Sequence, residues 1–470
     1  MGNLVDIEIC GDTIAVLVEG PLPLGEGHVY LCDRYQSVSD SFDCTKQNRI
    51  IVGESPKSFK YTSDCEKLIV ANEGRAGLLN GVFTDPVGTV SIIDKRLATA
   101  GAPCTRELSF NYFDSRTIDF LTKGLRWTYR GDHNNGIVTT FSQDLEPEGI
   151  AISDDNTRAY VTLPEANGIA EINLVNDSWL DMYAMGVKDW STQMLDASDS
   201  DAGINMVANY AVKGMYQPTA AVYVQGMTSH YVVTANTGAM RTYTMAEQGV
   251  DYSDNGRGHT LLFDSIIDAQ EIPANLIPDL NSNARLGRAH MSVVDGRSII
   301  SGLISDIHLF GGRDLGFWNT LSQSFTYTTG DQLETRAKDD FPAVFNGDCS
   351  DTASSPSDES DTRSDDLGPE PNVLAAGHYN SVPIIAAATR NGLIYLYTLS
   401  VNTPTFNSVY RLGNVTAEWG QAQGSAAAGD GIISDMGIIR QNIINSDPHP
   451  YVYVISRGTG SVSINRIVQT

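Results

Sequence analysis

Carboxylates gather at several points in this chain, and one such group lies in the segment LDASDSDAG. Asp196, Asp199 and Asp201 fall close together, and Gly203 permits a tight turn just after them. Carboxylate oxygens at this density suit Ca²⁺, which accepts about six to eight oxygen ligands in flexible geometry. The segment is not a helix–loop–helix calcium loop, because the twelfth position counted from Asp196 is Val207 instead of glutamate. A solvated turn whose aspartates cap backbone amides is an equal alternative.

Two glutamates lie at the ends of strand-like segments. Glu73 follows the apolar run in VANEG, and Glu148 precedes one in LEPEGI. If these strands belong to small sheets arranged radially, side chains at such ends can point toward a central channel. A ring of carboxylates there could hold a cation, so both glutamates are candidate calcium ligands.

A third group of carboxylates occupies the segment TRSDDLGPEP. Asp365, Asp366 and Glu370 stand close to Arg363. They are candidate calcium ligands as well, but an arginine within the same segment can neutralise them. Pinning of the loop by ion pairs is therefore the favoured interpretation here.

Motifs of the common hydrolases and nucleotide-binding enzymes do not occur in the sequence. It has no G-x-S-x-G, no Gly-Lys dipeptide, no H-E-x-x-H and no G-x-G-x-x-G after a strand. Whether the chain is an enzyme stays open, with a non-catalytic role favoured. The alternative is a Ca²⁺-dependent phosphoesterase of the alkaline phosphatase or phytase kind, with Arg75, Arg313 or Arg363 receiving phosphate.

The six cysteines favour disulfides and an extracellular location. They sit in polar, loop-like surroundings, and none forms a C-x-x-C pair. Cys32 and Cys44 flank a polar segment that a bridge could close, and a bridge from Cys349 to Cys104 would tether an acidic loop. Cys10 and Cys65 are further candidates for bridges, with no partner assigned to either. The alternative is six free thiols in a cytosolic protein.

Two glycosylation sequons point the same way. They begin at Asn176 and Asn414, and such triplets mark surface loops of secreted proteins.

The elements that must position these residues are short antiparallel hairpins. Each consists of two apolar stretches rich in β-branched and aromatic residues, broken at Gly or Asn. A hairpin that recurs in this way predicts an all-β fold and a single β-propeller domain over residues 1–470, with seven blades and eight as the alternative. The predicted hairpins cover 13–33, 67–94, 158–174, 231–244, 306–319, 383–399 and 451–467.

Three insertions interrupt this pattern, at about 99–135, 190–217 and 346–371. The first is predicted to form a long loop or an extra hairpin. The third is rich in Ser and Asp with almost no apolar residue, so it is expected not to pack a core. Loops of this length are usually functional or disordered.

The net charge of the chain indicates which classes of partner it can bind. Its 470 residues carry 57 acidic and 31 basic side chains, a formal net charge of −26 at pH 7. Such a field repels nucleic acids and attracts cations or basic partners. No run of apolar residues is long enough to span a membrane. The first residues look like folded strand, so a signal peptide is expected to have been removed or to be missing.

Several strings resemble the choice-of-anchor I family, in the same order as in that family. They are LIVANEGR, DPVGTVSIID, LEPEGIAISDDNTRAYVTLPEANGIAEINL, LDASDSDAGIN, VKGMYQP, LFGGRDLGFWN and TRSDDLGPEP. The family includes the mesenchyme-specific cell surface glycoproteins of biomineralising animals. The resemblance implies a secreted or surface-anchored β-propeller, linked in animals to calcified skeleton formation. At least three carboxylates that the family places at blade ends are replaced here, which favours a structural role.

The sequence therefore predicts an acidic extracellular or cell-surface propeller with a structural or adhesive role and Ca²⁺ as its cofactor. Its expected partners are matrix, biomineral or surface components, including other copies of itself in a filament. The second alternative to this role is a glycan- or protein-binding receptor module, in which Trp127, Tyr129 and Trp190 could stack on a sugar. Buried packing is the favoured use of these rings.

Overall fold

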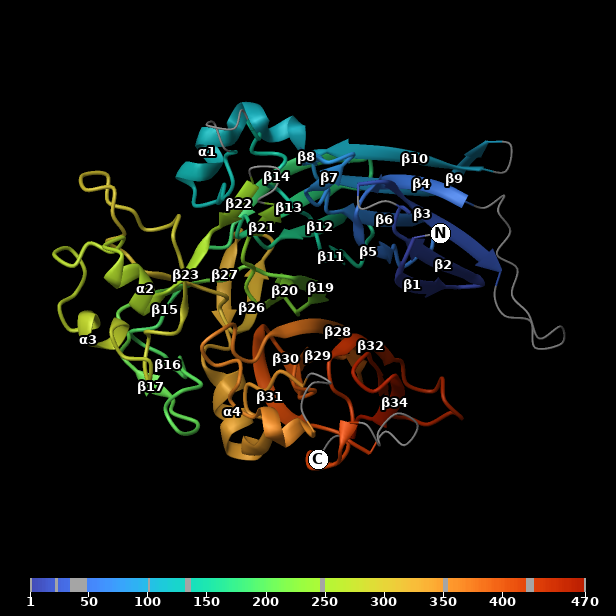
Figure 1. The fold of residues 1–470 in the computed structure, drawn as a ribbon. Coiled ribbons are helices and arrows are strands. Elements are labelled where there is room, and N and C mark those ends of the chain that lie inside the picture. The colour runs from blue at the N-terminus through green and yellow to red at the C-terminus, as the bar shows by residue number, and fades with distance from the viewer. Residues whose placement is uncertain are drawn as a thin grey trace. The chain divides into compact units, whose positions relative to one another are not determined.

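The computed structural model describes residues 2–21, 24–33, 49–99, 102–131, 137–245, 250–349, 354–419 and 427–468 (Figure 1). The chain divides into two compact units. Unit 1 contains Met1–Met185 and Arg241–Ser253, and unit 2 contains Gly186–Met240 and Asp254–Thr470. The prediction of one domain over the whole chain stays a prediction. No helix in the described part of the chain is long and apolar enough to cross a membrane.

Unit 1 is built from three four-stranded antiparallel sheets. Some of their strands alternate apolar and polar residues and others are continuously apolar. The chain reverses direction between strands at Gly and Asn, as in the predicted hairpins. In spatial order the first sheet is β1 (Leu4–Cys10), β2 (Thr13–Val18), β3 (Glu26–Asp33) and β4 (Arg49–Glu54). The second is β10 (Ala102–Ser109), β9 (Thr89–Thr99), β6 (Lys67–Asn72) and β5 (Pro56–Tyr61), and the third is β11 (Ile150–Ile152), β12 (Arg158–Leu163), β13 (Gly168–Asn173) and β14 (Ser178–Ala184). Two hairpins complete the unit, β7 (Gly77–Leu79) with β8 (Val82–Thr84) and β21 (Thr242–Met245) with β22 (Val250–Ser253).

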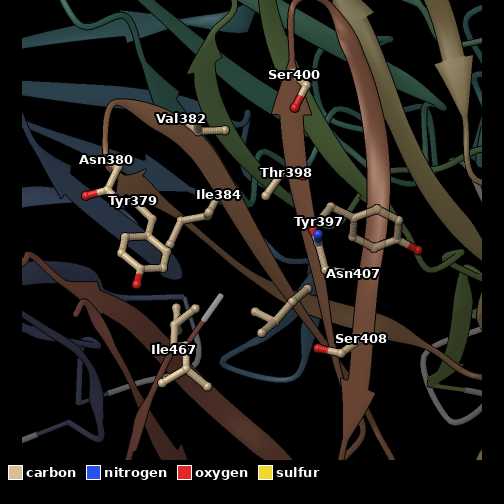
Figure 2. A pocket seen from close by; sticks show the side chains of 12 residues that line it. Tyr379, Asn380, Val382, Ile384, Tyr397, Thr398, Ser400, Asn407, Ser408 and Ile467 are labelled. Carbon is tan, nitrogen blue, oxygen red and sulfur yellow. The ribbon is translucent and has the colours of Figure 1, made fainter. Parts of the chain in front are cut away.

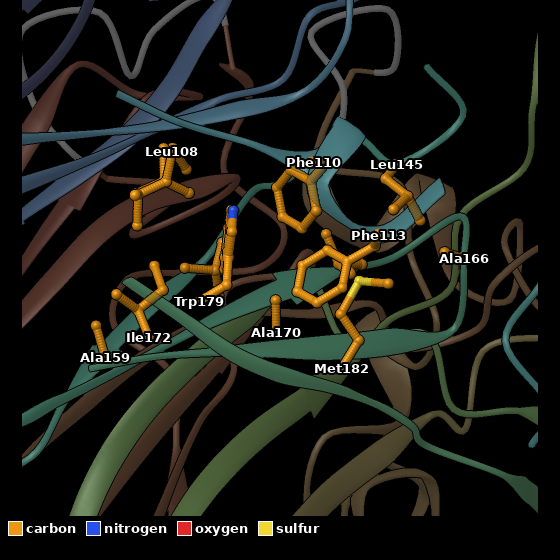
Figure 3. Close-up of a cluster of buried hydrophobic side chains, with 14 of the residues drawn as sticks. Leu108, Phe110, Phe113, Leu145, Ala159, Ala166, Ala170, Ile172, Trp179 and Met182 are labelled. Atoms are coloured by element: carbon orange, nitrogen blue, oxygen red, sulfur yellow. The ribbon is translucent and has the colours of Figure 1, made fainter. Parts of the chain in front are cut away.

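The first insertion is part of the core of unit 1 and not a bare loop. It supplies edge strand β10, the 3₁₀ turn η2 (Phe110–Arg116) and helix α1 (Thr117–Thr122). Figure 3 shows Phe110 and Phe113 against Trp179, with ring centroids 4.5 and 5.3 Å from that indole. The indole nitrogen of Trp179 donates to the carbonyl of Ser109 at 3.1 Å. Aromatic burial of this kind is what fixes the insertion in place.

Unit 2 contains four larger sheets. The first is β15 (Val187–Asp189), β18 (Lys213–Met215), β25 (His308–Phe310), β24 (His290–Ser292) and β23 (Asn255–Arg257), in which β18 and β25 run parallel. The second is β19 (Ala220–Gln225), β20 (His230–Asn236), β26 (Asp314–Asn319) and β27 (Ser324–Thr328). The third is β28 (Pro371–Tyr379), β29 (Val382–Thr389), β30 (Ile394–Ser400) and β31 (Thr403–Tyr410), and the fourth is β32 (Ile433–Ile439), β33 (Tyr451–Ser456) and β34 (Ser461–Arg466).

Short elements link these sheets. They are the hairpin β16 (Met194–Leu195) with β17 (Val207–Ala208), the helices α2 (Gly258–Phe263), α3 (Leu276–Leu280) and α4 (Gln332–Asp340), and the 3₁₀ turns η5 (Pro342–Val344) and η6 (Pro356–Glu359). The all-β class is confirmed. Propeller blades consist of small sheets of consecutive antiparallel strands like several of those described here. The number of blades stays a prediction.

Five of the predicted hairpins are confirmed as antiparallel pairs: β2 with β3, β6 with β9, β12 with β13, β29 with β30, and β33 with β34. The predictions over 231–244 and 306–319 are wrong. Strand β20 pairs with β26, with Tyr231 opposite Asn319, and β25 belongs to another sheet. An apolar strand followed by a glycine turn does not say which strand it pairs with.

Two glycines bring the segments after β20 and before β26 together. Gly238 and Gly311 adopt φ of +103° and +80°, a region that favours glycine. A Cβ on Gly238 would lie 2.8 Å from the Gly311 nitrogen, and one on Gly311 would lie 2.3 Å from the Thr237 oxygen. The two predicted turns therefore pack against each other. Neither glycine turn forms a hairpin, because the strands on its two sides belong to different sheets.

Candidate functional site

In unit 1, Glu73 and Glu148 meet at one lysine. Glu73 directly follows β6, Glu148 lies two residues before the start of β11, and Lys57 lies on β5. The Lys57 Nζ is 2.9 Å from Glu148 Oε1 and 3.8 Å from Glu73 Oε1. Burial raises the pKa of Glu148 to about 7, against the opposing charge of Lys57. The structure thus brings these two predicted residues together, around an ammonium group.

A buried arginine stands among the neighbouring carboxylates. Arg241 pairs with Glu146, and its guanidinium donates to the carbonyl of Asp144 at 2.9 Å and to the Tyr243 hydroxyl at 3.0 Å. The Asp144 carboxylate accepts the backbone N–H groups of Thr128 and Tyr129. The guanidinium of Arg241 and the carboxylate of Asp144 are therefore each held in place by several hydrogen bonds.

Asp85 is the last member of this group, and few contacts offset the burial of its carboxyl group. Its side chain is buried, and its Oδ1 has no hydrogen-bond partner in the described structure. Burial raises the pKa of Asp85 to about 8, Arg241 opposes the rise, and Asp144 adds to it. We call the following residues the unit 1 carboxylate cluster: Glu73, Asp85, Asp144, Glu146 and Glu148, with Lys57 and Arg241. Its acidic groups outnumber its two cations.

In unit 2, the three aspartates of LDASDSDAG do not converge. Asp196 is fully buried and accepts the backbone N–H groups of Asn205 at 2.6 Å and Ser198 at 3.4 Å. Burial, followed by the nearby charge of Asp361, raises the pKa of Asp196 to about 7. Asp199 instead forms a two-pronged pair with Arg288, at 2.8 and 3.1 Å. Capping of backbone amides, the alternative open from the sequence, is what Asp196 does.

The acidic segment of the third insertion is held by arginines, as favoured from the sequence. Asp365 lies 2.7 Å from Arg257 and 2.9 Å from Arg288. Arg363 lies 2.8 Å from Asp366 and 2.6 Å from Glu370. The pairs with Arg257 and Arg288 hold the segment against the rest of unit 2, and the pairs of Arg363 lie within the segment. All four are charge-assisted hydrogen bonds.

Asp366 has the strongest compensation in this segment. Burial alone would raise its pKa, but contacts with His290, Arg363 and Arg257 hold the pKa well below its ordinary value. Its Oδ1 lies 3.1 Å from His290 Nε2 and 2.9 Å from Arg257. This carboxylate is therefore ionised and fully paired.

Arg313 contacts two loops and helix α4 of unit 2. Its guanidinium donates to the carbonyls of Asp196 and Ser364, each at 2.8 Å, and to Glu334 Oε1 at 3.1 Å. The described parts of the insertion, 346–349 and 354–371, contain buried residues such as Ser364 and Asp365. Arginines take the place of apolar contacts there, so the expectation that the segment packs no apolar core of its own stays a prediction.

The candidate calcium ligands do not form a ready-made metal centre. Across the residues that the structure describes, no three His, Cys, Asp or Glu side chains are placed to hold a metal ion. The oxygens of Asp199, Asp365, Asp366 and Glu370 already face guanidinium groups. Asp201 lies nearby with a buried oxygen, Oδ1, that has no partner in the described structure. Ca²⁺ binding stays a prediction.

The cysteines give a mixed outcome. Cys10 and Cys65 form a disulfide with their Cα atoms 5.6 Å apart. Cys32 is also disulfide-bonded, and Cys44 lies outside the described residues. Cys104 is exposed and Cys349 is buried, and both are free. The predicted bridge between Cys104 and Cys349 is therefore wrong, since spacing alone cannot fix connectivity.

Both sequons are accessible. Asn176 and Asn414 are exposed, and their side-chain oxygens accept hydrogen bonds from Ser178 at 2.6 Å and from Thr416 at 2.9 Å. The three aromatic residues considered for sugar stacking are used in packing instead. Trp190 and Tyr129 are buried, and Trp127 lies partly buried against the core of unit 1.

Several residues of these sites were not singled out from the sequence. Arg241 and Asp85 lie far from their partners along the chain, and Glu334 lies on helix α4. A lone charged residue in an apolar stretch could have raised attention for Arg241. Its partner could not be named from sequence.

A family model, the choice-of-anchor I domain, matches residues 1–402. The chain belongs to the choice-of-anchor I family. This choice-of-anchor I chain is 27% identical over 334 residues to the mesenchyme-specific cell surface glycoprotein of Strongylocentrotus purpuratus, covering 67% of the chain and 43% of that protein. It is 26% identical over 196 residues to Gigasin-3a of Magallana gigas, covering 40% of the chain and 66% of that protein. The match thus spans less than half of the first relative.

Among solved structures, the choice-of-anchor I chain is similar to the β-propeller domain of Cps50 (Swd1) from Myceliophteria thermophila. The identity is 7%, the TM-score is 0.35, and the match covers 100% of the chain and 97% of that domain. A WD40 domain of Toxoplasma gondii coronin matches at 8% identity and TM-score 0.36, covering 99% of the chain and 81% of the domain. Likenesses this weak carry no argument about geometry or function.

Proposed function

We propose that this protein is an extracellular or cell-surface protein with a structural or adhesive role. One relative in the choice-of-anchor I family is named a cell surface glycoprotein. The accessible sequons at Asn176 and Asn414 are compatible with the same environment.

The observation that carries this proposal is the Cys10–Cys65 disulfide, which joins β1 to the turn before β6. Disulfides persist in oxidising compartments and are rare in the cytosol, where glutathione and thioredoxin keep thiols reduced. A bridge that links two sheets of unit 1 therefore favours a protein that acts outside the cytosol.

The test is performed on cells that make the protein naturally. A membrane-impermeant amine-reactive biotin reagent is applied to intact cells, and the labelled fraction is analysed by mass spectrometry for the redox state of Cys10 and Cys65. We expect biotin labelling together with a Cys10–Cys65 crosslinked peptide. A protein that stays unlabelled in intact cells, with both thiols reduced, would overturn the proposal. An abundant cytosolic protein serves as the control for leakage.

We also propose that the protein takes up Ca²⁺ through its excess of carboxylates, as part of an association with a matrix, a mineral coat or a surface filament. A net charge of −26 concentrates cations near the surface, and such attraction is screened by salt. Calorimetric titration with CaCl₂ should show weak binding at several sites that fades as NaCl is added. Absence of any binding at low salt would refute this part.

A further inference from the structure

One pocket of unit 2 is lined by residues that the function above does not use. It has a volume of about 430 Å³, within the range of about 300–1,000 Å³ that is usual for small-molecule sites. It lies on the face of the β28–β31 sheet, with the segment 467–468 along one side. Figure 2 shows Tyr379 and Ile467 on one side of this space and Asn407 and Ser408 on the other.

The lining carries no charged side chain, although the protein is strongly acidic. It consists of Tyr379, Asn380, Val382, Ile384, Leu396, Tyr397, Thr398, Ser400, Asn407, Ser408, Ile467 and Val468. An anion would be repelled by the net charge of the protein. A cation would find no counter-ion in the pocket, so its desolvation would go uncompensated. The pocket therefore favours an uncharged ligand.

The polar groups of the pocket are available for a ligand. Within the described chain, the side chains of Thr398, Ser400, Asn407 and Ser408 and the hydroxyl of Tyr379 make no hydrogen bond to protein. A purely apolar ligand would remove these groups from water without replacing their hydrogen bonds, which is costly. The ligand should therefore offer many donors and acceptors of its own.

Apolar surface lies beside these polar groups. Val382, Ile384 and Ile467 contribute aliphatic side chains, and Tyr379 contributes a ring. The ring of Tyr397 does not compete for this space, because its hydroxyl donates to Gln332 at 2.9 Å and its side chain is buried. A sugar ring combines an apolar C–H face with a rim of neutral hydroxyls, which matches an aromatic ring beside amides and hydroxyls.

We propose that this pocket binds a neutral carbohydrate. Tyr379 packs against the apolar face of a sugar ring, and Asn407, Thr398 and Ser400 exchange hydrogen bonds with its hydroxyls. The biological meaning of this site rests on the extracellular role proposed above, to which it adds a ligand for adhesion. The binding itself is a property of the purified chain and does not depend on that role.

The test uses the purified full chain and a panel of neutral oligosaccharides of glucose, xylose, mannose, galactose and N-acetylglucosamine, by saturation-transfer NMR and calorimetry. We expect at least one to bind, with an affinity that does not change between low and molar NaCl, because no ion pair is involved. Tyr379→Ala should weaken binding about tenfold and Asn407→Ala about fivefold. Tyr112→Ala, which removes an exposed tyrosine outside the pocket, should leave it unchanged.

Three results would overturn the proposal. They are no binding of any neutral saccharide in the panel, binding that survives both pocket substitutions unchanged, and binding that molar NaCl abolishes. Thermal unfolding of each variant checks that it is folded. Loss of cell-surface labelling with retained sugar binding would refute the extracellular role alone, whereas surface labelling without sugar binding would refute the pocket alone.

Discussion

Replacing Asp85 by asparagine should stabilise the protein, and the gain should grow with pH. Asp85 is buried with one unpartnered carboxylate oxygen, and burial raises its pKa from 3.8 to about 8. A carboxyl whose pKa is raised in the fold contributes stability that is complete below the unfolded pKa and is lost as pH rises through the folded pKa. The window for this loss is therefore about pH 4 to pH 8.

The magnitude follows from the shift. Each unit of pKa corresponds to about 1.4 kcal/mol, so the folded protein loses on the order of 5 kcal/mol from this one group across the window. Asparagine carries no charge at any pH. The difference in free energy of unfolding between Asp85→Asn and wild type should therefore increase by about 1.4 kcal/mol per pH unit up to about pH 8, and then level off.

Urea denaturation at a series of pH values, followed by intrinsic fluorescence, measures this difference. Glu148 and Asp196, whose raised pKa values have other causes, are present in both proteins and contribute to both. Glu146 differs, because the charge of Asp85 helps to raise its pKa, so part of the measured difference reflects Glu146. Asp251→Asn, at an exposed position on β22, serves as the matched surface control, for which we expect a small effect at every pH. A difference for Asp85→Asn that is the same at pH 5 and pH 9 would refute the reasoning.

Three further predictions concern stability. Replacing Cys10 and Cys65 together by serine should lower the free energy of unfolding by up to about 4 kcal/mol, because the bridge spans 55 residues, and urea midpoints with and without reductant will check this. Arg313→Met should cost about 3–5 kcal/mol by leaving the buried Glu334 carboxylate uncompensated, and a loss no larger than that of Arg313→Lys would contradict this. Trp179→Ala should cost about 3–5 kcal/mol through the cavity left beside Phe110 and Phe113, measured as a fall in thermal midpoint.

The sequence predicted local structure well and long-range pairing poorly. Hairpins such as β12 with β13 follow from alternating apolar residues that end at a turn residue, Asn167, whose φ of 52° the side chain tolerates. The pairing of β20 with β26 joins residues about 80 positions apart, and apolar patterning does not encode that choice. Their partners are set by how the two glycine turns fit together, which is visible only in the fold.

The same limit applies to the candidate sites. Placement at strand ends singled out Glu73 and Glu148, which both lie near Lys57. Clustering along the chain predicted that Arg363 pairs with the carboxylates of its own segment, and the ion pairs confirm this. It could not supply Arg241, whose partner Glu146 lies 95 residues away. Whether an acidic side chain binds a metal ion or pairs with an arginine depends on residues that are distant in the sequence. The calcium interpretation of Asp199 and Asp365 considered only the nearby carboxylates. It did not include Arg257 and Arg288, which pair with them in the fold.

Unit 1 is completed by residues 241–253, which follow a stretch belonging to unit 2. During synthesis the ribosome must therefore produce more than fifty residues beyond Met185 before Arg241 emerges to neutralise Glu146. Until then Glu146 and Asp85 lack the guanidinium of Arg241, whereas Lys57 is already present to pair with Glu148. A chaperone that shields the nascent amino-terminal half, or a pause in translation near Ser253, would thus have a direct effect on the yield of folded protein.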